Sequence, residues 1–328
     1  MNVIKKISRP PKALIFPKKF ERFGKFLVLI NYEKLTFLSL DQNSFSVFKT
    51  VELEFPVPFS EINFNFLTYA SDSKLSILAL KKKKNGAFLF EIDTNLTVNK
   101  KQDIPLESVS HIFLINHDTL LVSVLEGSIQ VLFQKNNIWI STPIQIPQKN
   151  FKAIECFPNV DNAFLFGESA KTFIILEISI TPENTKLKNI IKIPSEIGNL
   201  YYIDSSIALF TNQEKSSIFS IENLMIDLIN YEPLFELEGD QRVVTACSSL
   251  HQPQELILTG KSIIRWNKTE KQTVSSINLS NEVVQIFPLE NGKIIAITFS
   301  EIVLIDKNEE IEMTTSFVPC FMKAAANL

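Results

Sequence analysis

The stretch QELILTGKSIIRWNKTEKQTVSSINL, residues 254–279, contains the pattern that decides the fold. A first apolar run, 255–259, reaches the pair Gly260-Lys261, and a second apolar run, 262–266, follows it. A glycine between two apolar runs is typical of a tight turn between paired strands. A more polar segment then completes the stretch. The pattern predicts three neighbouring strands of one antiparallel sheet.

The same order of apolar strand, short polar turn and second strand occurs seven times in the chain. The second strands begin near residues 34, 87, 128, 172, 217, 262 and 301. Most intervals are close to 40–45 residues, which is the period of a four-stranded propeller blade. Candidate inner strands are 107–115, 151–156, 242–249 and 282–287, and more polar candidate outer strands are 137–146, 185–193 and 271–279. The sequence therefore predicts an all-β fold, a single seven-bladed β-propeller of four-stranded antiparallel blades.

The central strands give the physical reason for a closed ring. SILAL (76–80), AFLFEI (87–92) and FIILEI (173–178) are apolar at nearly every position. Strands that are buried on both faces have this pattern, whereas a sheet with one solvent face alternates apolar and polar residues. A blade with two apolar faces needs a neighbour on each side, and a ring provides one for every blade.

Charge is distributed unevenly along the chain. The formal net charge is −3, which argues against a strongly cationic coat that binds nucleic acid. Residues 1–50 nevertheless contain ten Lys or Arg against three carboxylates, a net of +7. We expect residues 1–23 to form a basic N-terminal arm and residues 24–328 to form the propeller. If the arm closes the ring by lending a strand to the last blade, the apolar stretch 12–16 is the candidate strand.

Two segments depart from the regular strand pattern. Residues 221–232 have apolar side chains at helical spacing, where the outer strand of the fifth blade should lie. A short helix or an irregular insertion is favoured there, with a strand as the alternative. The tail 314–328 is apolar in its middle, and we expect it to complete the last blade rather than to dock into a partner.

The sequence contains no recognisable catalytic or metal-binding arrangement. Cys156, Cys247 and Cys320 are far apart and odd in number, which favours neither a disulfide framework nor a zinc site. Only three histidines are available as general bases, and no glycine-rich phosphate loop is present. We therefore expect a protein that is not an enzyme, without a catalytic residue, cofactor, metal or small-molecule substrate.

The expected location is the nucleus or the cytoplasm. The N-terminal segment has lysine and arginine but lacks the apolar core of a secretory signal, so we do not expect secretion. No apolar run approaches the roughly 18 residues of a membrane span.

Two basic groups are candidates for contacts with phosphate or with an acidic partner. Clustered ammonium groups on a loop attract phosphates, although no aromatic platform for base stacking is evident near them in the sequence. A turn kept soluble by its charge is the alternative. The candidates are Lys81, Lys82, Lys83 and Lys84 in one predicted turn, and Lys5, Lys6, Arg9 and Lys12 near the N-terminus.

Over nearly its whole length, the chain resembles a WD40-type propeller in period and strand pattern. The Trp-Asp ending of that family corresponds here to Trp266-Asn267, and its Gly-His pair is missing, because His111, His117 and His251 do not fit it. The resemblance implies a rigid ring whose loops and edge strands bind protein partners.

Two segments are also similar to the non-catalytic WD-repeat subunit of tRNA guanine-N7 methyltransferase. Residues 86–133 look like its early blades and residues 237–274 like a later blade. The acidic-basic blade that this family usually shows between them is not visible here. The resemblance implies a non-enzymatic scaffold subunit of a multiprotein complex, with a role in tRNA processing.

Two alternatives remain open on the residues themselves. One is a propeller that binds RNA directly through a basic edge, and the other is a propeller enzyme with a site in its channel. The expected partners are proteins of a hetero-complex, with RNA contacted through the complex.

Overall fold

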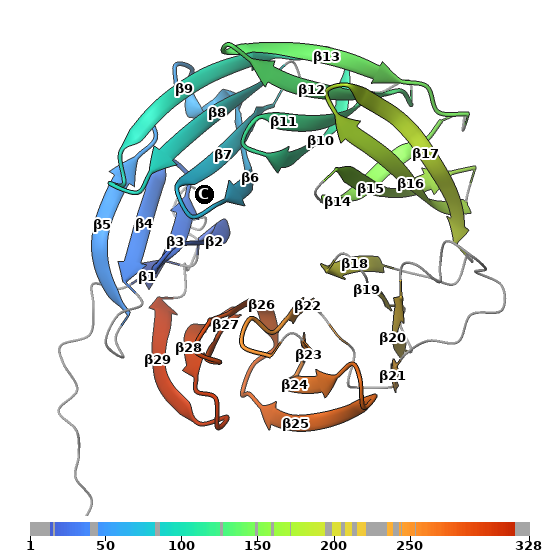
Figure 1. The fold of residues 1–328 in the computed structure, drawn as a ribbon. Helices are drawn as coiled ribbons and strands as arrows, with labels where there is room; N and C mark the ends of the chain where they lie inside the picture. Colours follow the sequence, from blue (N-terminus) through green and yellow to red (C-terminus); the bar gives the residue numbers. More distant parts are fainter. Residues whose placement is uncertain are drawn as a thin grey trace, which may run out of the picture.

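The computed structural model shows seven β-sheets arranged in a ring, and we call the side of their innermost strands the channel side (Figure 1). It describes residues 14–15, 17–39, 45–82, 86–124, 127–147, 150–158, 161–170, 172–193, 199–204, 207–211, 215–220, 235–238, 243, 245–252 and 254–318. These residues contain no α-helix, and a single 3-10 turn, η1 (Phe59–Glu61), connects the first two blades. The predicted all-β propeller fold is therefore confirmed.

Each blade is a meander of four antiparallel strands, a to d, from the channel outward. Blade 1 contains β2 (Lys19–Phe23), β3 (Phe26–Asn31), β4 (Lys34–Ser39) and β5 (Ser46–Glu52). Blade 2 contains β6 (Ile62–Ala70), β7 (Lys74–Lys81), β8 (Gly86–Asp93) and β9 (Val98–Pro105). Blade 3 contains β10 (Val109–Asn116), β11 (Thr119–Val124), β12 (Ile129–Lys135) and β13 (Ile138–Ile144). Blade 4 contains β14 (Lys152–Pro158), β15 (Asn162–Ser169), β16 (Thr172–Thr181) and β17 (Asn184–Ile193).

The last three blades follow the same strand order. Blade 5 contains β18 (Asn199–Asp204), β19 (Ile207–Thr211), β20 (Lys215–Ser220) and β21 (Phe235–Glu238). Blade 6 contains β22 (Thr245–Ser248), β23 (Glu255–Thr259), β24 (Ser262–Asn267) and β25 (Gln272–Asn278). Blade 7 contains β26 (Val283–Pro288), β27 (Ile294–Thr298), β28 (Glu301–Ile305) and β29 (Ile311–Val318). Every c strand begins within two residues of the position that the repeat predicted.

The two ends of the described chain meet at blade 7. There β1 (Leu14–Ile15) pairs parallel with β29 as a fifth strand, with Leu14 opposite Phe317. The stretch 12–16, the candidate for closing the ring, contains this strand. Blades 1 and 7 also share an apolar cluster, in which the Phe20 and Phe317 ring centroids lie 5.8 Å apart.

Some expected boundaries differ from the structure or fall outside the described residues. The innermost strand of blade 1 is β2, so the first blade begins at Lys19 rather than at residue 24. The tail contributes β29 up to Val318, and Phe321 and Met322 lie outside the described residues. The whole candidate helix, 221–232, also lies outside them, and the outer strand of blade 5 comes after it, as β21.

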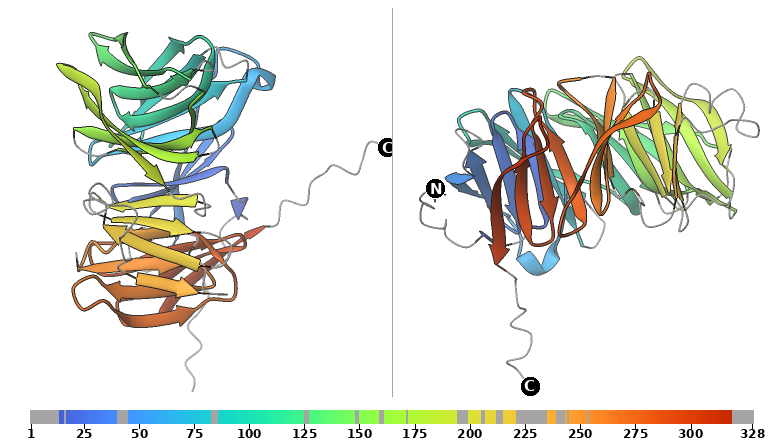
Figure 2. Two further views of the ribbon diagram at one scale, coloured as in Figure 1. Left: turned by 90° about the vertical axis from the view of Figure 1, so that its right-hand side faces the viewer. Right: turned by 90° about the horizontal axis from the view of Figure 1, so that it is seen from below.

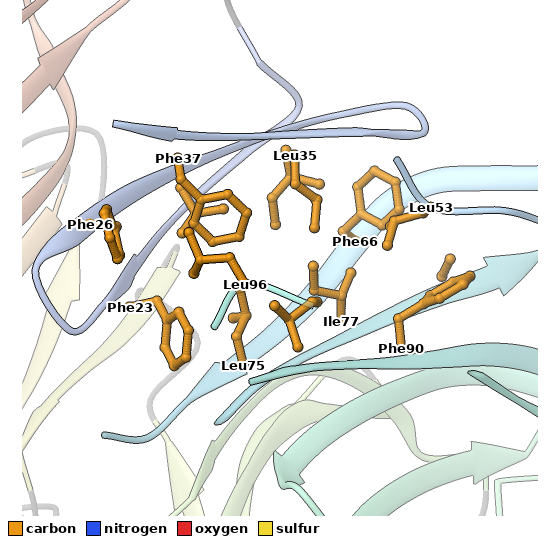
Figure 3. Close-up of a cluster of buried hydrophobic side chains, with 14 of the residues drawn as sticks. Phe23, Phe26, Leu35, Phe37, Leu53, Phe66, Leu75, Ile77, Phe90 and Leu96 are labelled. Carbon is orange, nitrogen blue, oxygen red and sulfur yellow. The ribbon is translucent and has the colours of Figure 1, made fainter. Parts of the chain in front are cut away.

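The hydrophobic core lies in the seams between neighbouring blades. In the seam between blades 1 and 2, Phe37 and Leu35 of β4 face Phe66 of β6 and Ile77 of β7 (Figure 3). The sheets stand side by side around the ring (Figure 2), so a central strand between two neighbouring blades can be covered on both faces. Accordingly β8 is buried along nearly its whole length, whereas the outer strand β5 is almost fully exposed. Burial on both faces explains the continuous apolar runs of the sequence.

A buried ion-pair group joins blades 6 and 7. Arg265 Nη1 lies 3.6 Å from Glu255 Oε2, and Arg265 Nε lies 3.7 Å from Glu309 Oε1. Arg265 Nη2 also donates to the Gly292 carbonyl at 3.0 Å. Burial raises the pKa of Glu309, and the positive charge of Arg265 acts in the opposite direction.

The meander order places the turns on two opposite rims of the ring. The a–b and c–d turns of every blade lie on one rim, which we call the a–b rim. The b–c turns and the connections between blades lie on the other, which we call the b–c rim. Loops on a rigid scaffold are the usual location of binding residues, so the two rims are the expected locations of a binding site.

Candidate interaction surfaces

The predicted basic turn lies on the b–c rim of blade 2. Lys81 Nζ is 2.7 and 2.9 Å from the two carboxylate oxygens of Asp103, and 4.8 Å from the Phe88 ring centroid. Lys82 is exposed, and its backbone nitrogen donates to the Glu61 carbonyl at 2.8 Å. Of the two lysines that the structure describes, Lys81 is paired with Asp103 and Lys82 is open to solvent. The candidates outside the described residues are Lys83, Lys84, Lys5, Lys6, Arg9 and Lys12.

Four aromatic side chains lie beside this turn, and we call them the aromatic strip: Tyr32, Phe55, Phe59 and Phe64. The Phe64 ring centroid lies 5.0 Å from that of Tyr32 and 5.9 Å from that of Phe59, and both contacts are edge-to-face. The Phe55 centroid lies 6.2 Å from that of Phe59. Tyr32 is 46% exposed and Phe59 is 49% exposed, so the strip is partly open to solvent.

Local backbone features aim these rings at the rim. Tyr32 lies in the two-residue turn between β3 and β4 with a φ of +51°, a conformation that such hairpin turns require. In β6 the pairing moves from Asn63 opposite Leu80 to Leu67 opposite Leu78, so three residues oppose one. A bulge of this kind bends the strand and redirects its side chains, here Phe64.

Charges of both signs surround the aromatic strip. Lys18 Nζ lies 5.5 Å from the Tyr32 ring centroid, and Lys34 lies 3.7 Å from Glu52. Glu54 and Glu61 are exposed on the connection between blades 1 and 2. Exposed aromatic rings surrounded by mixed polar groups are typical of protein–protein interfaces. Sequence reasoning missed this surface because its four rings lie on four separate elements, and the spacing along the chain carries no signal for their contact.

The innermost strands contain one carboxyl group with a perturbed pKa. Burial raises the pKa of Glu155 on β14, and the nearby charge of Lys19 on β2 acts in the opposite direction. The Cys156 backbone also acts to lower the pKa of Glu155. One carboxyl group of this kind is by itself no catalytic constellation.

The described cysteines are poor nucleophiles. Burial raises the pKa of the Cys156 thiol strongly, and Glu155 adds to this effect. Burial also raises the pKa of Cys247 to about 12, against a smaller opposite effect of Arg265. Both side chains are therefore neutral thiols at pH 7, which agrees with their interpretation as small packing residues. Cys320 lies outside the described residues.

The described residues form neither a metal-binding cluster nor a membrane-spanning helix. No three His, Cys, Asp or Glu side chains of the described residues gather in a way that could hold a metal ion. No helix within the same residues is long and apolar enough to cross a membrane.

Comparison with known proteins supports the fold. No family model matches the chain, and no curated protein matches its sequence. Many solved chains have a similar structure, among them the β-propeller domain of Cps50 (Swd1) from Myceliophteria thermophila. The TM-score is 0.57 at 13% sequence identity, and the match covers 87% of this chain and 94% of that domain. At this identity the similarity shows the β-propeller fold alone.

Proposed function

We propose that the chain is a non-enzymatic scaffold subunit of a multiprotein complex. The stiff ring would hold surface loops in fixed positions, and the partners would be proteins that bind to these loops. The observation that carries this proposal is the aromatic strip on the b–c rim of blades 1 and 2. Large aromatic side chains that are exposed together form the centre of many protein interfaces, where they supply most of the binding energy.

The narrower proposal is that the complex is a tRNA guanine-N7 methyltransferase. It rests on the resemblance of residues 86–133 and 237–274 to the WD-repeat subunit of that enzyme. In this form, the partner is the catalytic methyltransferase subunit, and RNA is contacted through the complex. The expected location is then the nucleus or the cytoplasm.

The test is affinity purification of the tagged full chain from its own cells. We expect stoichiometric partner proteins, and recovery of a methyltransferase subunit would support the narrower form. The double substitution Tyr32→Ser and Phe59→Ser should remove those partners. Phe299→Ser is the matched control, because Phe299 is 68% exposed on the same rim, in the b–c turn of blade 7. A monomer without partners, or equal recovery by the double variant, would contradict the proposal.

A second candidate function is direct binding of single-stranded RNA on the same rim. The observation in its favour is that the turn of Lys81 and Lys82 lies beside the aromatic strip. The Lys82 backbone nitrogen donates to the carbonyl of Glu61, which lies in η1 together with Phe59. Aromatic rings next to cations combine base stacking with attraction for phosphates. The test is whether the isolated chain retains RNA. Retention that decreases with salt would favour this function over the scaffold, provided that neutral residues at 81–84 abolish it.

A further inference from the structure

A pocket of about 410 Å³ opens between blades 3 and 4 on the a–b rim, away from the aromatic strip. These two blades are neighbours in the ring (Figure 1). The pocket is formed by the a–b turns of blades 3 and 4, the c–d turn of blade 4, and the ends of β6 and β12. Its main lining residues are Tyr69, His117, Asp118, Phe133, Asp161 and Pro182.

Backbone hydrogen bonds hold both aspartates in place. The Gln134 backbone nitrogen donates to the Asp118 carbonyl at 2.8 Å, and the Ile180 backbone nitrogen donates to the Asp161 carbonyl at 3.0 Å. The Asp118 nitrogen also donates to the Asn116 side chain at 2.9 Å. The main chain of each aspartate is thus tied to a neighbouring strand, while both residues remain exposed. Neither carboxylate forms an ion pair with another described residue.

The described residues that line the inner wall of the pocket carry no positive charge, and the nearby Lys74 lies 3.5 Å from Glu91. Hydrogen bonds of 2.8 Å join His117 Nδ1 to Ser76 Oγ and His117 Nε2 to Ser71 Oγ. Burial lowers the pKa of His117, the charge of Lys74 adds to this, and Glu91 and Asp118 oppose it. The imidazole is therefore neutral at pH 7, and none of the described residues that line the pocket is a lysine or an arginine.

Aromatic and aliphatic groups supply the remaining surface. The Tyr69 ring meets the His117 imidazole edge-to-face at 4.8 Å, and Phe133, Ile180 and Pro182 add apolar area. An arginine side chain matches this combination, because its methylene groups pack on apolar surface while its guanidinium pairs with carboxylates and stacks on rings. A lysine ammonium would use the charge but not the planar stacking.

We propose that this pocket binds an arginine side chain of a partner protein. This proposal rests on the proposed scaffold function only because it assumes that the arginine belongs to a partner protein. The pocket would be a second contact point on the opposite rim from the aromatic strip, so one partner could be held at one rim and another at the other. Recognition would come from charge complementarity between the two aspartates, whose main chains are held in place, and one guanidinium.

The test is titration of the isolated full chain with N-acetyl-arginine amide, observed by NMR at the histidine ring protons. The chain has three histidines, so the His117 signal can be assigned with a single His117→Gln variant. We expect a saturable shift of the His117 signal that weakens with salt, without a change at His251. N-acetyl-citrulline amide, which has the same shape without the charge, should leave the signal unchanged.

Two variants separate the pocket from general electrostatics. Asp118→Asn combined with Asp161→Asn should abolish the saturable shift. Glu290→Gln, which removes one exposed carboxylate from the a–b turn of blade 7, should leave the shift intact. An equal response to citrulline, or a response that survives in the double variant, would overturn the proposal. An equal response to N-acetyl-lysine amide would overturn the choice of guanidinium.

The same measurement is independent of the proposed function. It uses no partner, so failure to recover a complex from cells would leave it unaffected. Conversely, a chain that assembles with partners but shows no arginine response would retain the scaffold function and lose the pocket.

Discussion

Two groups of aromatic side chains in blades 1 and 2 meet at Phe55. On one side, Phe55 contacts Phe90, whose ring centroid lies 5.1 Å away and which is completely buried in the seam between the blades. On the other side, it contacts Phe59, which is about half exposed on the rim. The residue type is the same, and only the position relative to the seam differs. We infer that buried rings hold the blades together, whereas exposed rings are available for binding.

The largest expected effect breaks the buried side of this comparison. Phe90→Ala removes a ring that neighbouring side chains surround completely, and the ring cannot be replaced by water. Such a substitution costs about 3–5 kcal/mol in the free energy of unfolding. Urea unfolding, followed by the fluorescence of the buried Trp266, measures it. A loss below about 1 kcal/mol would be smaller than the usual cost of a cavity in a protein core. It would mean that the seam does not hold the blades together.

The next prediction extends the comparison from rings to ion pairs. Arg265→Met leaves Glu255 buried without its cation, and removal of one partner from a buried pair costs about 3 kcal/mol or more. Lys81→Met breaks the pair with Asp103, whose side chain is half exposed, and should cost at most about 1 kcal/mol. The two unfolding curves should therefore separate clearly. Equal losses would show that burial does not decide the strength of these pairs.

A smaller effect on stability is expected on the exposed side. Phe59→Ser should change the free energy of unfolding by at most about 0.5 kcal/mol, because surface substitutions rarely exceed this value. The same variant should weaken partner recovery, which the core variant would affect only through unfolding. A stability loss as large as that of Phe90→Ala would assign Phe59 to the core and remove the basis for the aromatic strip.

The smallest effect concerns a single charge on the channel side of blade 4. The pKa of Glu155 is raised in the folded state, so its ionised form disfavours folding at pH 7. Glu155→Gln should therefore give a small gain in stability at pH 7. The gain should disappear as the pH falls through the Glu155 pKa, because the protonated carboxyl carries no penalty. Parallel melting curves of the two proteins at pH 7 and pH 4 measure it, and a gain that persists at pH 4 would contradict the electrostatic cause.

The periodic part of the structure could be predicted from the sequence. The apolar runs around Leu78, Leu176 and Ile257 alternate with short polar turns, and this local pattern specifies strands wherever they lie in space. Packing then leaves little choice, because sheets that are apolar on both faces must cover one another. The predicted start of the c strands at residues 172, 262 and 301 was therefore correct, as was the placement of β13 and β25 at the exposed outer edge of their blades.

The binding surfaces could not be predicted in the same way. The lysines at 81 and 82 were candidates, but the pairing of Lys81 with Asp103 and the neighbourhood of Phe59 depend on the register of β8 and β9 and on η1. No local pattern marks a two-residue bulge at Phe64 or a positive φ at Tyr32.

The sequence by itself determined where most of the central strands form and which of them are buried. These properties follow from side-chain hydrophobicity at neighbouring positions, which the chain carries locally. Only the tertiary structure decided that Tyr32 meets Phe64 and that Asp118 and Asp161 line one pocket. Those contacts join residues from different turns and blades, and they exist only after the ring has fixed the turns in space.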